Sequence, residues 1–360
     1  MQLDEGITAS VPRAKSKSQR SISSVKRKFF LSGSIVLLLI ASVFAFKSKS
    51  NAPQLTSELA PQNRVDSPTL PGAGFGQFPP ETDAERELEK MLHGKDDDID
   101  LALANWLIAA DVPQFSGMSR EVYFKKLDGM MEQVRQEMAG MEKVAISRGK
   151  NPKDADTRLS IFCNAIIKLR FDYADEFRQH DLTAQQNKNL NADANNIFLA
   201  GLLRTQRGTC ISMPLVYLVI GQRLGLPIHL VAIGKHYFVR WQEPGYRMNI
   251  ETTRVDKVWV TDDDSAYIED EGLTRDQLQG SDLRNLTNRE VVGQLFFARS
   301  VHWLAARISR SRSWADLARA FHLAPEDSAI AKTRQAIFNR HQITPEDTFI
   351  TLKQKEGNSI

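Results

Sequence analysis

The chain has few cysteines: only Cys163 and Cys210 occur among its 360 residues. Two cysteines do not make a disulfide framework, although a single bond between them stays conceivable and would block both thiols. A strong net charge is also absent, since the whole chain carries +3. Residues 1–28 hold seven Lys or Arg against two acidic residues, so this basic tail carries +5 and the remainder −2. No nucleic-acid partner is predicted.

Clusters of metal-binding residues are missing as well. Three consecutive aspartates at 96–98 precede a predicted helix, where negative charge stabilises the N-terminus, and those at 262–264 are expected in a solvated turn. The methionines of residues 118–141 come without partnered His or Cys, which favours packing over a copper or haem site. No metal or cofactor is therefore expected.

One long apolar run does occur, the uncharged stretch of 18 residues at 29–46. This length is close to what a membrane-spanning helix needs, and the basic residues before it predict a cytoplasmic N-terminus. The main domain is then periplasmic or otherwise extracytoplasmic. A retained anchor is predicted because the segment is long for a signal peptide, although Val43 and Ala45 would also satisfy a cleavage site. Residues 47–80 are Pro-rich and predict a disordered tether.

Cys210 stands before an apolar run, residues 211–220, that predicts a buried helix. Thr209 is a candidate cap, and Gly208 is expected to let the preceding chain turn tightly. The helix should end at Gly225, since glycine adopts the left-handed conformation past a C-terminus. Cys210 is therefore predicted at the positive end of a helix dipole, where the nucleophilic thiolate is favoured. Cys163, inside an apolar helical pattern, is interpreted as packing.

The residues after this helix read as three strands, at 228–233, 236–241 and from 246 onward. If residues 242–245 form the hairpin loop, Trp241 faces Tyr246 and His236 faces Glu251 on one sheet face. Glu251 would then orient one nitrogen of His236 and leave the other for Cys210, the arrangement of a catalytic triad.

Two further residues share the face of His236. Asn249 is the possible substitute for Glu251 as the acid partner. Arg240 is expected to be solvated, with contact to an acidic substrate as the alternative.

Four segments carry a resemblance to the transglutaminase-like superfamily, papain-related thiol enzymes, and within it to the SirB-type branch. They are RGTCISM at 207–213, RLGLPIHLV at 223–231, KHYFVRW at 235–241 and NIETT at 249–253. The resemblance implies an α+β fold with a helical N-terminal part and a Cys-bearing helix packed on a small antiparallel sheet. In the wider superfamily the third residue is usually Asp before Pro-Thr, whereas here Glu251 precedes Thr-Thr.

The segment before the Cys helix is polar and rich in Asn, as in the family, where a similar segment precedes the helix under the nucleophile. It is expected to form one wall of the cleft. Asn196 and Gln206 are candidates for holding an oxyanion, together with Asn195 and the backbone N–H of Cys210.

The C-terminal third of the chain predicts helices only. Thr287 and Glu290 form a capping box before an apolar run, and two further helical segments extend to about His341. The helix–turn–helix resembles one tetratricopeptide unit, as in the SirB-type branch, and should pack on the catalytic region because a solenoid needs about three units. We expect a transglutaminase-like domain at 81–270 and tetratricopeptide-like helices at 286–341.

The resemblance implies acyl transfer or amide hydrolysis by a Cys-His-Glu triad, acting on a protein or peptide substrate. Nothing in the chain chooses between water and an amine as the acceptor. The alternative is a membrane-tethered scaffold that keeps the fold without the chemistry and recruits a protein partner through its C-terminal helices.

Overall fold

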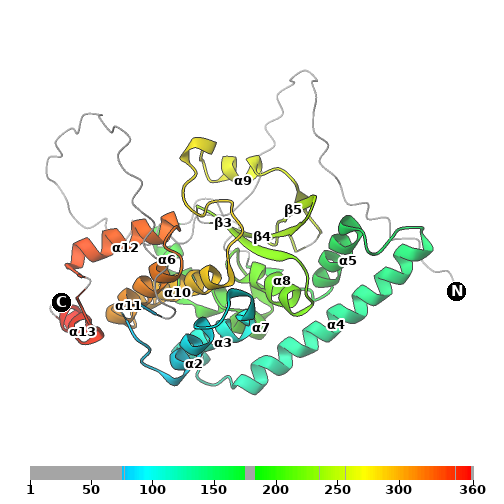
Figure 1. Ribbon diagram of the computed structural model, residues 1–360. Helices are drawn as coiled ribbons and strands as arrows, with labels where there is room; N and C mark the ends of the chain where they lie inside the picture. Colours follow the sequence, from blue (N-terminus) through cyan, green and yellow to red (C-terminus); the bar gives the residue numbers. More distant parts are fainter. Residues whose placement is uncertain are drawn as a thin grey trace.

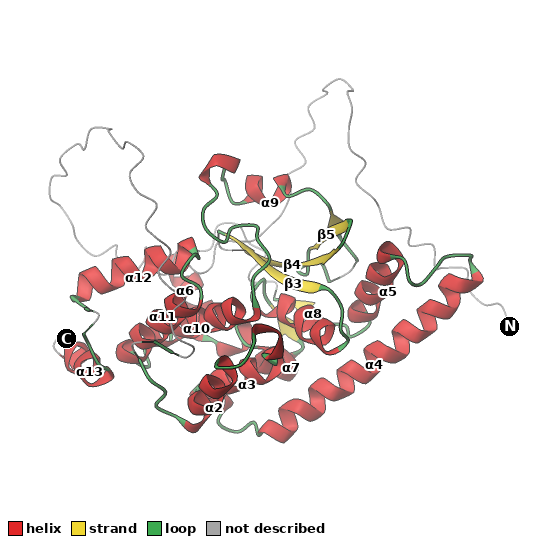
Figure 2. Cartoon of the chain, in the orientation of Figure 1, coloured by secondary structure: helices red, strands yellow, loops and turns green. Residues whose placement is uncertain are grey.

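The computed structural model describes residues 75–357, except 77, 175–182, 235, 256 and 345. The predicted basic tail, the predicted membrane helix at 29–46 and most of the predicted tether lie outside these residues. Within the described part of the chain, none of the helices combines the length and apolarity that crossing a bilayer requires. The fold is mixed α+β and mostly helical, with a small four-stranded antiparallel sheet and a set of C-terminal helices (Figure 2).

The packed part of the chain begins before the predicted boundary at residue 81. Phe75 and Phe78 are buried, and the Phe75 ring meets the Phe296 ring edge-on with 5.2 Å between centroids. Burying two aromatic side chains supplies the free energy that ordering this short stretch costs. Phe75 and Phe78 therefore belong to the packed part of the chain, before the predicted domain start at residue 81.

The first helices form the helical N-terminal part that the resemblance implies. They are α2 (Asp83–Leu92), α3 (Leu101–Ala110), α4 (Arg120–Ser147) and α5 (Ala155–Ile167). Side chains of Thr82, Asp100 and Ser119 accept backbone N–H bonds at the starts of the first three. Figure 1 shows α4 as a long helix along one side of the molecule, with α5 folded back beside it.

The aspartates at 96–98 form a short 3-10 helix, η1 (Asp96–Asp98). The Asp96 side chain caps the start of a helix that is far away in the chain. Its two carboxylate oxygens accept the backbone N–H groups of Asn288 at 2.9 Å and Arg289 at 2.8 Å, in the first turn of the C-terminal helix α10. Asp96 thus places negative charge at the N-terminus of α10. The sequence had predicted this role at the helix that follows the aspartates in the chain.

Short elements lead to the Cys-bearing helix. They are η2 (Pro113–Phe115), β1 (Asp172–Tyr173), α6 (Ala184–Ala192), η4 (Ala194–Asn196), α7 (Leu199–Thr205), β2 (Arg207–Gly208) and α8 (Ser212–Arg223). Strands β1 and β2 pair in parallel. Helix α8 ends as predicted, because Gly225 has φ 65° and the Leu226 N–H returns to the Gly221 carbonyl at 2.9 Å.

The sheet has the order β3-β4-β5-β6, all antiparallel. Its strands are β3 (Ile228–Ile233), β4 (His236–Glu243), β5 (Tyr246–Ile250) and β6 (Val260–Thr261). Helix α8 packs against β3 and β4, and α9 (Ser265–Asp270) covers the sheet on the opposite side (Figure 1).

The predicted register of the β4–β5 hairpin was wrong by two residues. Glu243 pairs with Tyr246, so Pro244 and Gly245 alone form the turn, and Trp241 lies opposite Met248. Gly245 has φ 76°, which suits the third position of a turn that has proline at the second. Because side chains alternate with a period of two, a shift of two residues leaves every side chain on its predicted face.

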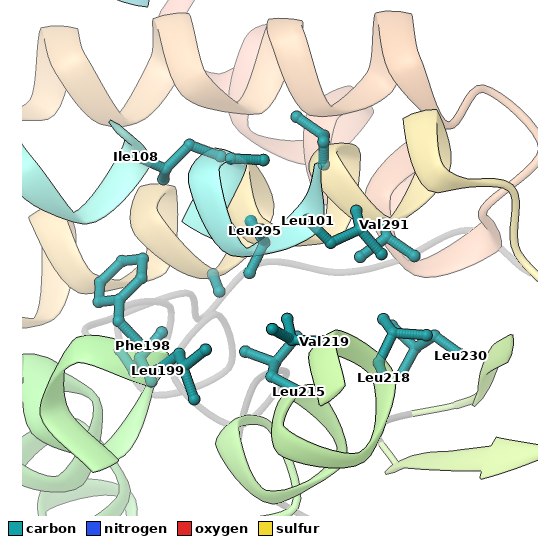
Figure 3. Close-up of a cluster of buried hydrophobic side chains, with 14 of the residues drawn as sticks. Leu101, Ile108, Phe198, Leu199, Leu215, Leu218, Val219, Leu230, Val291 and Leu295 are labelled. Atoms are coloured by element: carbon teal, nitrogen blue, oxygen red, sulfur yellow. The ribbon is translucent and has the colours of Figure 1, made fainter. Parts of the chain in front are cut away.

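The remaining elements are helical: η5 (Arg275–Gln277), α10 (Asn288–Ala305), α11 (Arg310–Leu323), α12 (Ser328–His341) and α13 (Phe349–Gly357). The predicted capping box at Thr287 and Glu290 is confirmed. Helix α10 packs against α3, α6 and α11, so the C-terminal helices share the main hydrophobic core. Figure 3 shows this core, with Leu101 of α3 beside Val291 of α10.

A buried ion cluster joins α2 to α10 and α11. Arg299 donates to Asp316 at 2.7 Å and to Glu85 at 2.7 Å, and Arg319 donates to the same Glu85 oxygen at 2.7 Å. The indole N–H of Trp303 adds a bond to Asp316 at 2.7 Å. These five residues are called the Arg299 cluster below.

Candidate active site

Cys210 lies in the turn that leads into α8. The Met213 N–H bonds to the Thr209 carbonyl at 2.9 Å, so helical hydrogen bonding starts just before Cys210, and the Ile211 N–H bonds to the Thr209 hydroxyl at 3.1 Å. Cys210 therefore directly precedes the N-cap residue of α8, at the N-terminal end of the helix.

Gly208 has a different role from the predicted one. A Cβ atom at this position would lie 2.4 Å from the Leu202 side chain and 2.7 Å from Met213. A larger residue here would make the ends of those two flexible side chains shift, and the φ of Gly208 is not positive. Gly208 pairs with Tyr173 between β1 and β2, and the left-handed residue of the preceding chain is Gln206.

The Cys210 side chain is completely buried. Cys163, on α5, is buried as well, and burial raises the pKa of its thiol. Both cysteines are free, so the conceivable disulfide between them is absent. A reagent or substrate reaches the Cys210 sulfur only if surrounding side chains move.

His236 and Glu251 form a hydrogen-bonded ion pair. The Nε2 of His236, the first residue of β4, lies 2.8 Å from a Glu251 carboxylate oxygen, and both side chains are at most 4% exposed. Continuing the observed register would place Glu251 opposite Phe238, one step along the face from His236. The two side chains therefore meet diagonally, while direct opposition was predicted.

The other oxygen of Glu251 is held by Thr253. It accepts the Thr253 N–H at 2.9 Å and the Thr253 hydroxyl at 2.7 Å. Burial by itself would raise the pKa of Glu251, but the His236 charge and these hydrogen bonds outweigh it and lower the pKa below its usual range. Glu251 is thus a fixed anion beside the ring.

Burial also competes with charge and hydrogen bonding at His236, but there the pKa is raised instead of lowered. Burial alone disfavours the charged imidazole, but the Glu251 charge and the interaction with Cys210 raise its pKa well above the ordinary value. The second ring nitrogen, Nδ1, is buried and has no partner in hydrogen-bonding geometry among the described residues. Since Glu251 occupies Nε2, this Nδ1 is the atom left for a proton exchanged with Cys210 or a substrate.

Two aromatic rings fix the plane of the His236 ring. Phe238 and Tyr267 stack on it with centroids 6.3 Å and 6.0 Å away, and they stack on each other at 4.0 Å. Sequence reasoning missed Tyr267 because it comes from α9, in a stretch without a motif. Thr253 was also missed, although its position two residues after a carboxylate is a recognisable turn pattern.

Asn249 is not placed to substitute for Glu251. It lies directly opposite Arg240, whose Nε donates to its side-chain oxygen at 2.7 Å, and its amide donates to Asp264 at 2.7 Å. The expectation that Arg240 and Asp264 are solvated was wrong, since Arg240 is buried and also donates to Asp264 at 3.1 Å. This polar group ties β4 and β5 to the start of α9.

The upstream amides are not aimed at Cys210. The Asn196 amide donates to the Leu190 carbonyl at 3.0 Å, Asn195 binds Arg204, and Gln206 is an exposed left-handed cap of α7. The backbone N–H of Cys210 has no acceptor among the described residues, so it stays available to an oxyanion. No group of three or more His, Cys, Asp or Glu in the described ranges could hold a metal ion.

A family model described as the transglutaminase-like superfamily matches residues 121–296. These residues form a transglutaminase-like superfamily domain. The domain runs from the start of α4 into α10 and contains Cys210, His236 and Glu251. No curated protein and no solved structure gives a significant match to the chain. The match ends within α10, although the hydrophobic core of the transglutaminase-like domain continues into α11 and α12.

Proposed function

We propose that this chain is a membrane-anchored thiol enzyme that transfers or hydrolyses acyl groups through Cys210, His236 and Glu251. The observation that carries the proposal is the buried His236–Glu251 pair at 2.8 Å, whose second ring nitrogen has no partner among the described residues. A buried polar atom without a partner costs about 1–3 kcal/mol, and this nitrogen is the atom that the proposed reaction uses. The transglutaminase-like domain supplies independent support.

In the proposed reaction the Cys210 thiolate attacks the carbonyl carbon of an amide, and the new S–C bond turns the carbonyl oxygen into an oxyanion. The Cys210 backbone N–H donates to that oxygen. The C–N bond then breaks while His236 Nδ1–H gives its proton to the departing amine. Water or a second amine attacks the thioester, loses a proton to His236, and releases the thiolate.

The complete burial of Cys210 adds a condition to this mechanism. The side chains over the sulfur must move before a substrate carbonyl comes within bonding distance. We infer that the described conformation is closed and that opening precedes acylation. In this proposal the acyl acceptor is water or an amine, and residues 29–46 anchor the chain in the membrane.

Burial of the thiol also supports a second candidate function, a tethered scaffold without chemistry. In that case Cys210 is packing, as Cys163 is, and the C-terminal helices bind a protein partner. The two candidates differ in how Cys210 reacts, and Cys163 supplies an internal reference because it is buried without a histidine partner.

Alkylation with iodoacetamide, followed site by site by peptide mass spectrometry, tests the proposal. An enzyme should show Cys210 modified at least about tenfold faster than Cys163 near neutral pH, with the advantage lost in His236→Ala. Equal, slow modification of both cysteines in the folded chain would favour the scaffold. If Cys210 shows the fast, His236-dependent modification, adducts that the Cys210→Ser variant traps in membranes would identify the acyl donor.

A further inference from the structure

The peptide bond between Thr209 and Cys210 has a bonded carbonyl and an N–H without a partner. The Thr209 carbonyl accepts the Met213 N–H at 2.9 Å, at the start of the hydrogen bonding of α8. In a planar trans peptide bond the carbonyl and the N–H point in opposite directions. The Cys210 N–H therefore points out of the N-terminal end of α8, and it has no acceptor in the part of the chain that the structure describes.

The Thr209 side chain holds this peptide bond in place. Its hydroxyl donates to the Asn196 carbonyl at 2.7 Å and accepts the Ile211 N–H at 3.1 Å. The first bond joins the nucleophile turn to η4, and the second fixes the backbone on the far side of Cys210. Thr209 is buried, so bulk water does not compete for these two bonds.

Ser212 holds the backbone of Thr209 from the other side. Its hydroxyl oxygen accepts the Thr209 N–H at 3.0 Å, and the whole residue is buried. A side chain that reaches back to the N–H three residues earlier is one half of a capping box. Thr209 thus has its N–H, its hydroxyl and its carbonyl bonded, which leaves little freedom in the direction of the adjoining Cys210 N–H.

We propose that Thr209 is a positioning residue that holds the Cys210 N–H in the direction of the reaction's oxyanion. The inference rests on the proposed function, in which this N–H donates to the oxyanion. The sulfur and the N–H belong to the same residue, so the oxygen of a carbonyl that the sulfur attacks comes within about 3 Å of the nitrogen. A donor that is already held in place needs no reorganisation when the charge develops. Thr209 acts through the backbone of Cys210 and does not touch the substrate.

Two reagents for the same sulfur separate the direction of the N–H from general damage to the site. With p-nitrophenyl acetate the Cys210 thiolate attacks the ester carbonyl and forms an oxyanion. An S–C bond then replaces the C–O bond, and p-nitrophenolate leaves with the electron pair. Iodoacetamide alkylates the thiolate by direct displacement of iodide, without an oxyanion. Loss of the oxyanion donor should therefore slow acylation and leave alkylation almost unchanged.

Thr209→Val keeps the shape of the side chain and removes the hydroxyl bonds to Asn196 and Ile211. In the full-length protein, acylation of Cys210 should fall at least about tenfold, while alkylation should change by less than about threefold. Thr209→Ser restores the hydroxyl and should return acylation to within about threefold of the wild type. Absorbance of the p-nitrophenolate released in the first turnover measures acylation, after subtraction of the release by Cys210→Ser.

The matched control is Thr205→Val, the same chemical change at the end of α7. The Thr205 hydroxyl donates to the Gly201 carbonyl at 2.9 Å and lies 3.2 Å from the Arg207 carbonyl oxygen. This variant also loses hydroxyl bonds to the backbone near the site, but these bonds do not hold the peptide group of the nucleophile. Both reactions should stay within about threefold of their wild-type rates.

Ser212→Ala is a second test variant, in case Thr209→Val does not fold. It removes the acceptor of the Thr209 N–H and leaves the Thr209 hydroxyl in place. Acylation should fall by about threefold or more, with a smaller change in alkylation. Circular dichroism establishes that each variant is folded.

The positioning role and the enzyme fail in different ways. The positioning role alone is overturned if both test variants leave acylation unchanged, or slow acylation and alkylation equally, while alkylation of wild-type Cys210 depends on His236. A wild-type protein with such alkylation but no release of p-nitrophenolate would do the same. Alkylation of Cys210 that ignores His236 would overturn both proposals.

Discussion

Two buried charged groups in this molecule differ in how completely their polar atoms are hydrogen-bonded. In the Arg299 cluster, both guanidinium groups and both carboxylates bind one another, and Trp303 adds a donor. In the His236–Glu251 pair, Nδ1 of the ring has no partner among the described residues. The first group has its charges fully paired across three helices, whereas the second leaves one ring nitrogen for the proton transfer that we propose.

The clusters also differ in what they connect. The Arg299 cluster spans α2, α10 and α11, with partners 214 residues apart in the chain, whereas His236 and Glu251 are 15 residues apart across one hairpin. Loss of the first should therefore loosen the whole molecule. Loss of the His236–Glu251 pair should change the reactivity of Cys210 with less effect on folding.

The largest expected effect comes from Arg299→Met. Removing this guanidinium leaves Glu85 and Asp316 buried with fewer counter-charges, which should lower the free energy of unfolding by about 3–5 kcal/mol. Urea denaturation followed by fluorescence measures the change. The control is Arg120→Met, which breaks the exposed Arg120–Glu87 pair and should cost less than about 1 kcal/mol. Equal losses of unfolding free energy in the two variants would show that burial does not increase the contribution of the Arg299 cluster to stability.

Acid should weaken the Arg299 cluster over a defined pH range. Burial opposes the charge on Glu85, but Arg319 and Arg299 lower its pKa to about 2. A carboxylate with a lowered pKa stabilises the fold above its ordinary pKa of about 4.5 and loses that contribution as the pH falls toward 2. The loss amounts to roughly 3 kcal/mol. Urea midpoints from pH 6 to pH 3 should fall more steeply in the wild type than in Glu85→Gln.

The His236–Glu251 pair should respond at the alkaline side instead. Because the folded pKa of His236 is raised, its contribution to stability is complete below the unfolded value of about 6.5 and disappears as the pH rises through the folded pKa. The stability advantage of the wild type over His236→Gln should therefore shrink between pH 6 and pH 10. An advantage that grows over this range would contradict the assigned direction of the shift.

The smallest effect is expected from Thr253→Val, which deletes one hydroxyl bond to Glu251 and keeps the backbone bond. The free energy of unfolding should fall by about 1 kcal/mol. Cys210 alkylation should slow by a few-fold, because Glu251 holds the ring less firmly. Thr253→Ser restores the hydroxyl and should return both measurements toward the wild-type values. No recovery in the serine variant would show that loss of the hydroxyl bond is not the cause of the effect.

Local pattern was enough to predict several parts of the site. The apolar run after Cys210, the glycine at 225 and the alternating strands indicated a Cys-bearing helix followed by a hairpin. The face shared by His236 and Glu251 followed from alternation, and an error of two residues in register left it unchanged. The capping box at Thr287 was equally local.

Predictions that depended on distant neighbours were less successful. Arg240 and Asp264 looked like surface charges, yet they bond each other and Asn249 between two strands and a helix start. Asp96 caps a helix 192 residues away. The Arg299 cluster had no sequence signal at all, since its residues become neighbours only when α2 packs on α10 and α11.

The sequence by itself determined which residue types could act and which face of a strand or end of a helix each would occupy, because backbone periodicity fixes those directions. Only the tertiary structure decided which of them met. It joined His236 to Glu251 while Asn249 bonds to Arg240, and it buried the Cys210 sulfur. It also left Nδ1 of His236 without a partner in the described part of the chain. Hydrogen-bond partners and burial depend on packing between segments far apart in the chain, which no local pattern contains.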